Sequence, residues 1–257
     1  MSTRHLTHSR TLVPAAHPAL LSSAILLLVV GVLTACLTGA FRVERIAVVG
    51  AGVPQYRVEQ AAGVLGQNVF SVRSDQIVWR VSRLPTVEVT RVDVSFPNTV
   101  TVYAHLRQGY ALWQNGKTVY VLDQTGRIIG TSPAPSALPL IVAVDSPSPP
   151  DFGMMQAVRY ADTVLPGDPD GAILPAQLYR QYGLVLTGRS GWHALIGTGT
   201  PQNLGARVAT LSAALKKIAD QGQQLLFVDL RRGQPYYCQR SVGACVSMPR
   251  QFATPAH

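Results

Sequence analysis

The chain has 257 residues, of which 22 are lysine or arginine and 13 are acidic, and its net charge is +9. This positive charge would suit a surface that lies near anionic lipid or an acidic polymer. The arginines, however, are scattered along the chain rather than gathered into a stripe. We therefore predict no nucleic-acid partner.

An apolar segment lies near the start of the chain. Residues 11–41 carry no charged side chain, and residues 19–40 are almost wholly apolar. This apolar stretch is long enough to cross a bilayer once. Only about 18 residues precede this segment, and long domains are translocated largely regardless of their charge. We therefore expect a cytoplasmic tail at residues 1–18, a transmembrane helix at residues 19–40, and a single-pass type II protein in the cell membrane with most of its chain extracytoplasmic.

Two other interpretations of this segment remain open. It is longer than the apolar stretch of about 7 to 15 residues that a cleaved signal peptide carries. In addition, the residues Leu33-Thr34-Ala35-Cys36 resemble a bacterial lipobox, in which the cysteine is acylated after cleavage. Either alternative still places the remainder of the chain across the membrane.

The first stretch after the segment, residues 41–108, has the pattern of a small β-α-α-β-β domain. A short strand is expected at residues 44–49, and a helix with apolar residues at helical spacing should end at Gly66. A second helix should be capped by Ser74 and ended by Pro85. Two alternating strands, separated by a turn at Pro97, complete the pattern.

Residues 109–240 have the pattern of a β-rich domain with a packed helix. Asp123 and Gly126 are expected to turn a hairpin, and the proline-rich residues 133–150 should form a surface connector. One helix is expected around residues 154–165. Another should run over residues 203–220 with Asn203 as its cap, before a β-type segment at residues 225–230.

Patterns that would indicate an enzyme are incomplete. Gly50-Ala51-Gly52 imitates the start of a dinucleotide-binding fingerprint, but Gln55 stands at the third glycine position. His105 and His193 have no acidic partner near them in the sequence, and no zinc or phosphate-loop pattern occurs. We therefore predict no catalytic, cofactor-binding or metal-binding residues.

Two cysteines lie close together near the end of the chain. Cys238 and Cys245 are seven residues apart, and in an oxidising compartment they could form a disulfide that closes a small loop. A metal site there would need two further ligands.

Several short motifs, in this order and at this spacing, resemble the FtsQ/DivIB family of bacterial cell-division proteins. They are Phe41-Arg42-Val43-Glu44-Arg45-Ile46-Ala47-Val48-Val49-Gly50, Gly66-Gln67-Asn68-Val69-Phe70, Leu84-Pro85-Thr86-Val87, Phe96-Pro97-Asn98-Thr99-Val100, Tyr120-Val121-Leu122-Asp123-Gln124-Thr125-Gly126 and Leu226-Phe227-Val228-Asp229-Leu230-Arg231. The resemblance implies an α+β fold: a single N-terminal transmembrane helix, a POTRA domain at residues 41–108, an FtsQ-type β-domain at residues 109–240 and a C-terminal tail at residues 241–257.

The resemblance also implies a function. It implies a non-enzymatic scaffold at the division septum that recruits small bitopic partners resembling FtsL and FtsB/DivIC, and with them the septal peptidoglycan synthesis machinery. Recruitment would occur by strand pairing near an open sheet edge and by POTRA contacts. The partner-binding residues it implies are Phe227, Val228, Asp229, Leu230, Arg231 and Tyr236.

Alternatives to this function remain open. Phe227, Val228 and Leu230 have the character of ordinary core residues, in which case Asp229 and Arg231 would be surface neighbours. Another POTRA-containing component of envelope assembly or secretion would carry a similar first domain. An exported lipoprotein acylated at Cys36 is the third possibility.

Overall fold

The computed structural model describes residues 18–37, 41–132, 136–165, 174–232, 235–239 and 248–252. Most of the predicted tails at residues 1–18 and 241–257, the side chain of Cys36, and Cys245 lie outside the described residues. The chain forms two compact units. Unit 1 comprises Met1–Ser82 and Val89–His105, and unit 2 comprises Arg83–Glu88 and Leu106–His257.

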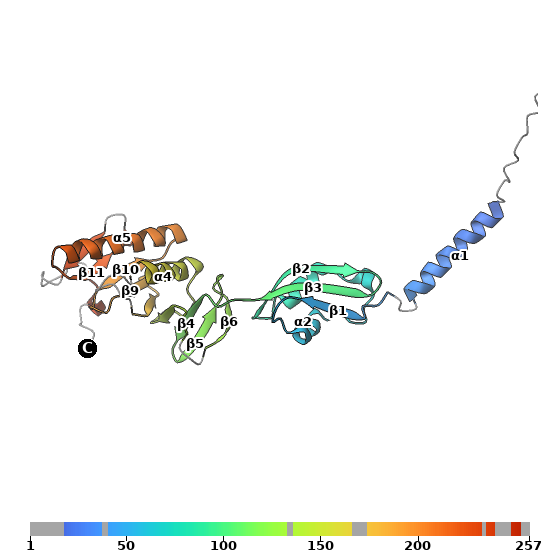
Figure 1. Ribbon diagram of the computed structural model, residues 1–257, viewed down its shortest axis with the longest axis horizontal. Helices are drawn as coiled ribbons and strands as arrows, with labels where there is room; N and C mark the ends of the chain where they lie inside the picture. The colour runs from blue at the N-terminus through green and yellow to red at the C-terminus, as the bar shows by residue number, and fades with distance from the viewer. Residues whose placement is uncertain are drawn as a thin grey trace, which may run out of the picture. The chain divides into compact units, whose positions relative to one another are not determined.

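Helix α1 spans Pro18–Leu37 (Figure 1). Large apolar side chains are exposed over its described part, namely Ile25, Leu26, Leu27, Leu28, Val29, Val30, Val32 and Leu33. Among the residues that the structure describes, no helix meets the combined length and hydropathy required to cross a membrane. The predicted span at residues 19–40 lies partly outside the described residues.

The β-α-α-β-β order predicted after this helix is confirmed. The elements of unit 1 are β1 (Arg45–Val49), α2 (Gln55–Ala62), the 3-10 helix η1 (Val69–Ser71), α3 (Ser74–Val81), β2 (Val87–Ser95) and β3 (Thr99–Leu106). The sheet has the order β1-β3-β2, with β1 parallel to β3. Val100, Val102 and Ala104 of β3 are buried, as their alternation with polar residues predicts.

Three helix ends in unit 1 differ from their predictions. Helix α3 ends at Val81, with Ser82 as its C-cap, and not next to Pro85. Helix α2 ends at Ala62 and not at Gly66, because Gly63 adopts the left-handed conformation (φ +61°) and its N–H donates to the carbonyl of Glu59. Ser74 is the first residue of α3 and not its cap. The cap position belongs to Arg73, whose carbonyl accepts the first helical hydrogen bond, from the N–H of Ile77.

Unit 2 contains one nine-stranded mixed sheet with the order β12-β11-β10-β9-β8-β7-β4-β5-β6. Its strands are β4 (Ala111–Asn115), β5 (Thr118–Leu122), β6 (Ile128–Thr131), β7 (Leu140–Ala143), β8 (Ala176–Tyr179), β9 (Gly183–Thr187), β10 (His193–Gly197), β11 (Leu225–Asp229) and β12 (Tyr236–Gln239). Strands β6 and β12 are its two ends.

The prediction of a surface connector at residues 133–150 is wrong for part of this range. Strand β7 lies within it and pairs in parallel with both β4 and β8. Ile141 is fully buried, and four apolar residues between proline-rich flanks are enough for a strand because two partner strands satisfy its backbone. This short strand joins the β4–β5–β6 hairpins to the rest of the sheet.

The hairpin turn predicted at Asp123 and Gly126 connects β5 to β6. The Asp123 carboxylate accepts hydrogen bonds from the N–H and hydroxyl of Thr125 (2.8 and 2.6 Å), the N–H of Arg127 (3.0 Å) and the guanidinium of Arg107 (2.8 Å). Burial would raise the pKa of Asp123, but these hydrogen bonds outweigh it and hold the pKa below its ordinary value.

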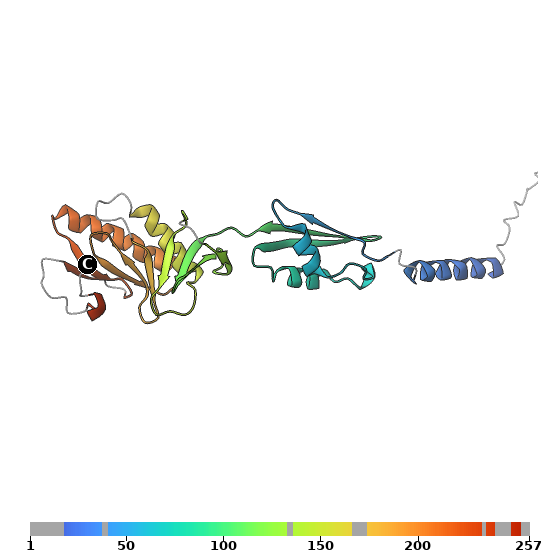
Figure 2. The ribbon, with the colours of Figure 1, turned by 90° about the horizontal axis from the view of Figure 1, so that it is seen from below.

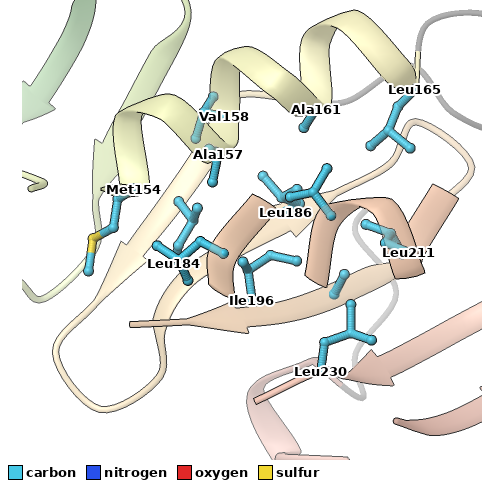
Figure 3. Close-up of a cluster of buried hydrophobic side chains, with 14 of the residues drawn as sticks. Met154, Ala157, Val158, Ala161, Leu165, Leu184, Leu186, Ile196, Leu211 and Leu230 are labelled. Atoms are coloured by element: carbon cyan, nitrogen blue, oxygen red, sulfur yellow. The ribbon is translucent and has the colours of Figure 1, made fainter. Parts of the chain in front are cut away.

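Helices α4 (Phe152–Val164) and α5 (Pro201–Asp220) lie side by side over one face of the sheet (Figure 2). The main core fills the space beneath them, where Ala157 and Ala161 of α4 lie above Leu184 and Ile196 of the sheet (Figure 3). Asp151 caps α4 by accepting from the N–H of Met154. The cap of α5 is Thr200 and not the predicted Asn203, because the chain turns into the helix ahead of Pro201.

A second, smaller core covers the opposite face of the sheet. It contains Val185, Leu195, Phe227, Cys238 and Phe252, the last contributed by the 3-10 helix η2 (Arg250–Phe252). Every residue of β9 is consequently buried, as expected of a strand that is covered on both faces.

Candidate partner-binding edge

The segment predicted to bind partners forms the last two strands of the sheet. Strand β11 pairs in parallel with β10, placing Phe227 beside His193, and in antiparallel fashion with β12, placing Val228 beside Tyr237. It is therefore an internal strand whose backbone is paired on both sides. Among the described strands, β12 is the one at this end of the sheet.

The apolar residues among the predicted contacts belong to the two cores. Phe227 and Val228 are completely buried on opposite faces of β11, and Leu230 is 4% exposed. Their side chains cannot reach a partner while the fold is intact. Their positions agree with the alternative left open by the sequence, in which these three residues are part of the core.

Strand β12 presents the exposed side chains of this region. Tyr236 and Tyr237 are 37% and 41% exposed, whereas Cys238 is buried. Tyr236 was singled out from the sequence, and Tyr237 was not. The signal for Tyr237 was present in the pair of tyrosines that follows Pro235, because aromatic residues favour strands and a proline suits the start of an edge strand.

A groove of about 210 Å³ runs along β12 on the side of the sheet that α5 covers. We refer to it as the edge groove. Its lining residues are Ala214, Lys217, Ile218, Gln221, Tyr237 and Gln239. Its lining combines apolar side chains with amide, ammonium and phenol groups. It lies next to β12, whose outer side pairs with no strand in the part of the chain that the structure describes.

Asp229 and Arg231 form an ion pair where β11 ends. The Arg231 guanidinium donates to both Asp229 carboxylate oxygens (2.9 and 2.7 Å) and lies over the ring of Tyr182 (5.5 Å). Burial would raise the pKa of Asp229, but the hydrogen bonds from Arg231 lower it by more, so the carboxylate is charged at neutral pH. The pair therefore fixes the conformation of the chain where β11 ends.

A second arginine, on α5, binds the same segment after β11. Arg207 donates to the carbonyl oxygens of Ile196 (2.7 Å), Thr198 (3.0 Å) and Arg231 (3.2 Å). Next to it lies a cavity of about 270 Å³, which Arg232 and Pro235 also line. The turn that leads into β12 is thus anchored to both β10 and α5.

Cys238 is disulfide-bonded. The other half of this bond is not among the side chains that the structure describes, so the predicted pairing with Cys245 stays a prediction. The bond begins in the second core, next to Phe227, and thereby ties β12 to a further segment of chain.

His193, considered above for catalysis, contributes to packing. Its Nδ1 lies 3.1 Å from the hydroxyl of Thr187, and its ring lies against Phe252 (5.3 Å between centroids). Burial lowers the pKa of His193, so the ring is neutral at pH 7.

Comparison with known proteins supports the resemblance seen in the sequence. No family model matches it. A cell division protein FtsQ from Chloroflexus aggregans is 25% identical over 219 residues, which cover 79% of this chain and 75% of that protein. This alignment spans most of both chains, and it agrees with the order of motifs and with the β-α-α-β-β segment followed by a large sheet. The chain is therefore a distant relative of this cell division protein FtsQ.

Proposed function

We propose that this protein is a non-enzymatic, membrane-anchored scaffold that recruits division proteins by adding a partner strand to β12. The observation that carries the proposal is the position of β12 at the end of the nine-stranded sheet. An edge strand offers unpaired N–H and C=O groups, and an extended partner segment can satisfy them as one more strand.

The surroundings of β12 would add specificity to this pairing. Tyr236 and Tyr237 are exposed aromatic residues of the kind enriched at interaction sites. The edge groove would accept a side chain of the added strand, because it follows the same edge. Asp229 and Arg231 would act indirectly, by fixing the direction in which the chain enters β12.

We further propose that residues 19–40 anchor the protein in the cell membrane, with the rest of the chain outside the cytoplasm. The exposed aliphatic side chains of α1 support this proposal, since lipid would cover them. Residues 41–108 would act as a POTRA domain and residues 109–240 as the β-domain. The partners would be FtsL-like and FtsB/DivIC-like bitopic proteins, which bring the peptidoglycan synthesis machinery to the septum.

Photocrosslinking in growing cells tests this function. A photoreactive phenylalanine analogue is placed at Tyr237 in the full chain, and a matched variant carries it at Tyr160, a tyrosine of α4 that is 40% exposed. We expect small single-span proteins to attach at position 237 and not at position 160. Equal capture at both positions, or none at position 237, would contradict strand addition at this edge.

Two proline variants separate strand pairing from side-chain contact. Successive residues of a strand direct their N–H groups to opposite sides, so only one of Tyr236 and Tyr237 directs its N–H outward. Consequently, one of Tyr236→Pro and Tyr237→Pro should leave the fold intact and the other should disturb the pairing with β11. The variant that keeps the wild-type melting temperature should lose the crosslinked partners, measured with the photoreactive residue at Gln239.

A further inference from the structure

Three phenylalanine rings from separate segments of unit 1 form one cluster, in which Phe70 and Phe96 are exposed and Phe41 is half-buried. The ring of Phe70 lies 5.1 Å from that of Phe41 and 5.1 Å from that of Phe96, measured between centroids. Phe41 precedes β1, Phe70 belongs to η1, and Phe96 lies in the turn between β2 and β3. Phe70 and Phe96 are 60% and 62% exposed, although large aromatic side chains are normally covered.

Backbone hydrogen bonds hold these segments together. The N–H of Val69 donates to the carbonyl of Phe41 (2.7 Å), and Arg42 forms an isolated antiparallel bridge with Asn68. On the other side, the N–H of Glu44 donates to the carbonyl of Asn98 (2.9 Å). The cluster is therefore a fixed feature of the fold and not a chance meeting of mobile side chains.

The chain length places this cluster close to the end of α1. Helix α1 ends at Leu37, and Phe41 follows four residues later. Four fully extended residues reach at most roughly 14 Å, so Phe41 must lie within that distance of the last helical residue. If α1 crosses the bilayer, the cluster can reach the lipid boundary on the extracytoplasmic side.

Positive charge accompanies the exposed rings. Arg42 and Arg45 are both exposed, and neither pairs with a carboxylate in the part of the chain that the structure describes. Glu44, which lies between them, accepts a hydrogen bond from the Asn98 side-chain amide (2.7 Å). Exposed aromatic rings next to unpaired arginines suit an interface between anionic head groups and acyl chains.

We propose that Phe41, Phe70 and Phe96 insert into the surface of an anionic membrane and hold unit 1 against it. This proposal rests on the proposed function in one respect, since it requires α1 to be the membrane anchor. The rings would bury apolar surface at the boundary, while Arg42 and Arg45 would contact lipid phosphates. Unit 1 would then be held at a defined orientation next to the bilayer instead of turning freely on its tether.

Tryptophan quenching tests the insertion. The full chain carrying Trp79→Phe, which removes the exposed native tryptophan, is combined with Phe70→Trp and reconstituted into vesicles of phosphatidylglycerol and phosphatidylcholine. The phosphatidylcholine is brominated near the head-group end of its acyl chains. We expect about twofold quenching at position 70, as for a ring that enters roughly 5 to 10 Å into the interface.

The control uses the same background with Tyr56→Trp, on α2 of the same unit, where the native side chain is 72% exposed. Quenching at position 70 and not at position 56 supports insertion. Equal quenching at both positions, or none at position 70, overturns it. The adjacent arginines are tested with Arg42→Gln and Arg45→Gln together, which should reduce the quenching at position 70. If quenching is unchanged both in this variant and in vesicles without phosphatidylglycerol, the assignment to anionic lipid is wrong.

Flotation of the same vesicles distinguishes this inference from the proposed anchor. Protein that floats with the vesicles but shows no quenching at position 70 retains its anchor and refutes only the insertion of the cluster. Protein that does not float refutes the anchor and the insertion together. Capture of a protein partner from cells at position 70, without quenching in vesicles, would assign the cluster to protein recognition and overturn the lipid proposal.

Discussion

The guanidinium of Arg207 on α5 donates a hydrogen bond to the main-chain oxygen of Arg231, 3.2 Å away and two residues beyond the end of β11. The same guanidinium also donates to the carbonyls of Ile196, a buried residue of β10, and of Thr198, the residue that follows this strand. One side chain thus joins α5, β10 and the segment that leads to the edge strand.

Replacing Arg207 with lysine should loosen this junction. A lysine ammonium is a compact donor and cannot replace a planar guanidinium that reaches three carbonyls. We expect Arg207→Lys to lower the free energy of unfolding by about 1 to 3 kcal/mol, measured by urea denaturation. Lys216→Ala, on the exposed face of the same helix, is the control and should change stability by less than about 0.5 kcal/mol. Equal stabilities of the two variants would show that the junction contributes nothing.

Asp123 should make stability depend on acidity. Its pKa is lowered in the folded state, so its contribution is present above the ordinary value of 3.8 and is lost as the pH falls through the lower folded value. Asp123→Asn should cost about 1 to 3 kcal/mol at neutral pH, because it weakens the hydrogen bond from Arg107 and changes those in the turn. The measurement is the free energy of unfolding between pH 7 and about pH 3, over which the difference from wild type should shrink. A difference that stays constant over this range would contradict the role of the charge.

His193 should make stability depend on pH in a higher pH range than Asp123 does. Burial lowers its folded pKa below 6.5, so stability is complete above that value and falls as the pH drops towards the folded pKa, because the unfolded chain binds the proton first. His193→Gln should flatten the dependence of the melting temperature on pH between 7 and about 5. His105→Gln, at an exposed residue of β3, should retain the wild-type slope. If the pH dependence of the melting temperature were lost in His105→Gln and not in His193→Gln, the prediction for His193 would be wrong.

Phe252 should stabilise the second core despite its place near the end of the chain. Its ring contacts those of Tyr179, Tyr182 and Phe227 at centroid distances of 5.6, 5.7 and 6.3 Å. We expect Phe252→Ala to cost about 3 kcal/mol in unfolding free energy. The neighbouring exposed residue provides the matched control, Gln251→Ala, which should be nearly neutral. A neutral Phe252→Ala would mean that η2 packs too loosely to contribute.

Local patterns predicted the elements whose signals are contained within a few residues. Val100 and Val102 alternate with polar neighbours and are buried in β3, and Asp123 and Gly126 form the turn of a hairpin. Strand β7 was missed because its four residues show no alternation and lie between prolines, so its identity depends on the pairing with β4 and β8.

In the candidate site too, local sequence predicted the strands, whereas the burial of their residues depends on contacts between distant segments. The β-type character of Phe227 and Val228 was visible in the sequence, but their burial within an internal strand follows from the pairing with β10 and β12. The strand character of Tyr237 was visible next to Pro235, but its exposure at a sheet end depends on strand order, which is fixed by contacts between distant segments. The cluster at Phe70 was likewise hidden, since its three rings come from positions far apart in the chain.

The nine-stranded sheet has one further consequence for assembly. Neighbouring strands lie about 4.8 Å apart, so β6 and β12 are separated by roughly 38 Å across the sheet. Peptides that extend the sheet at these opposite margins would not collide, and neither would need to dissociate before the other arrived. If strands add at both margins, in the way proposed for β12, unit 2 would have room for two strand-forming ligands at once.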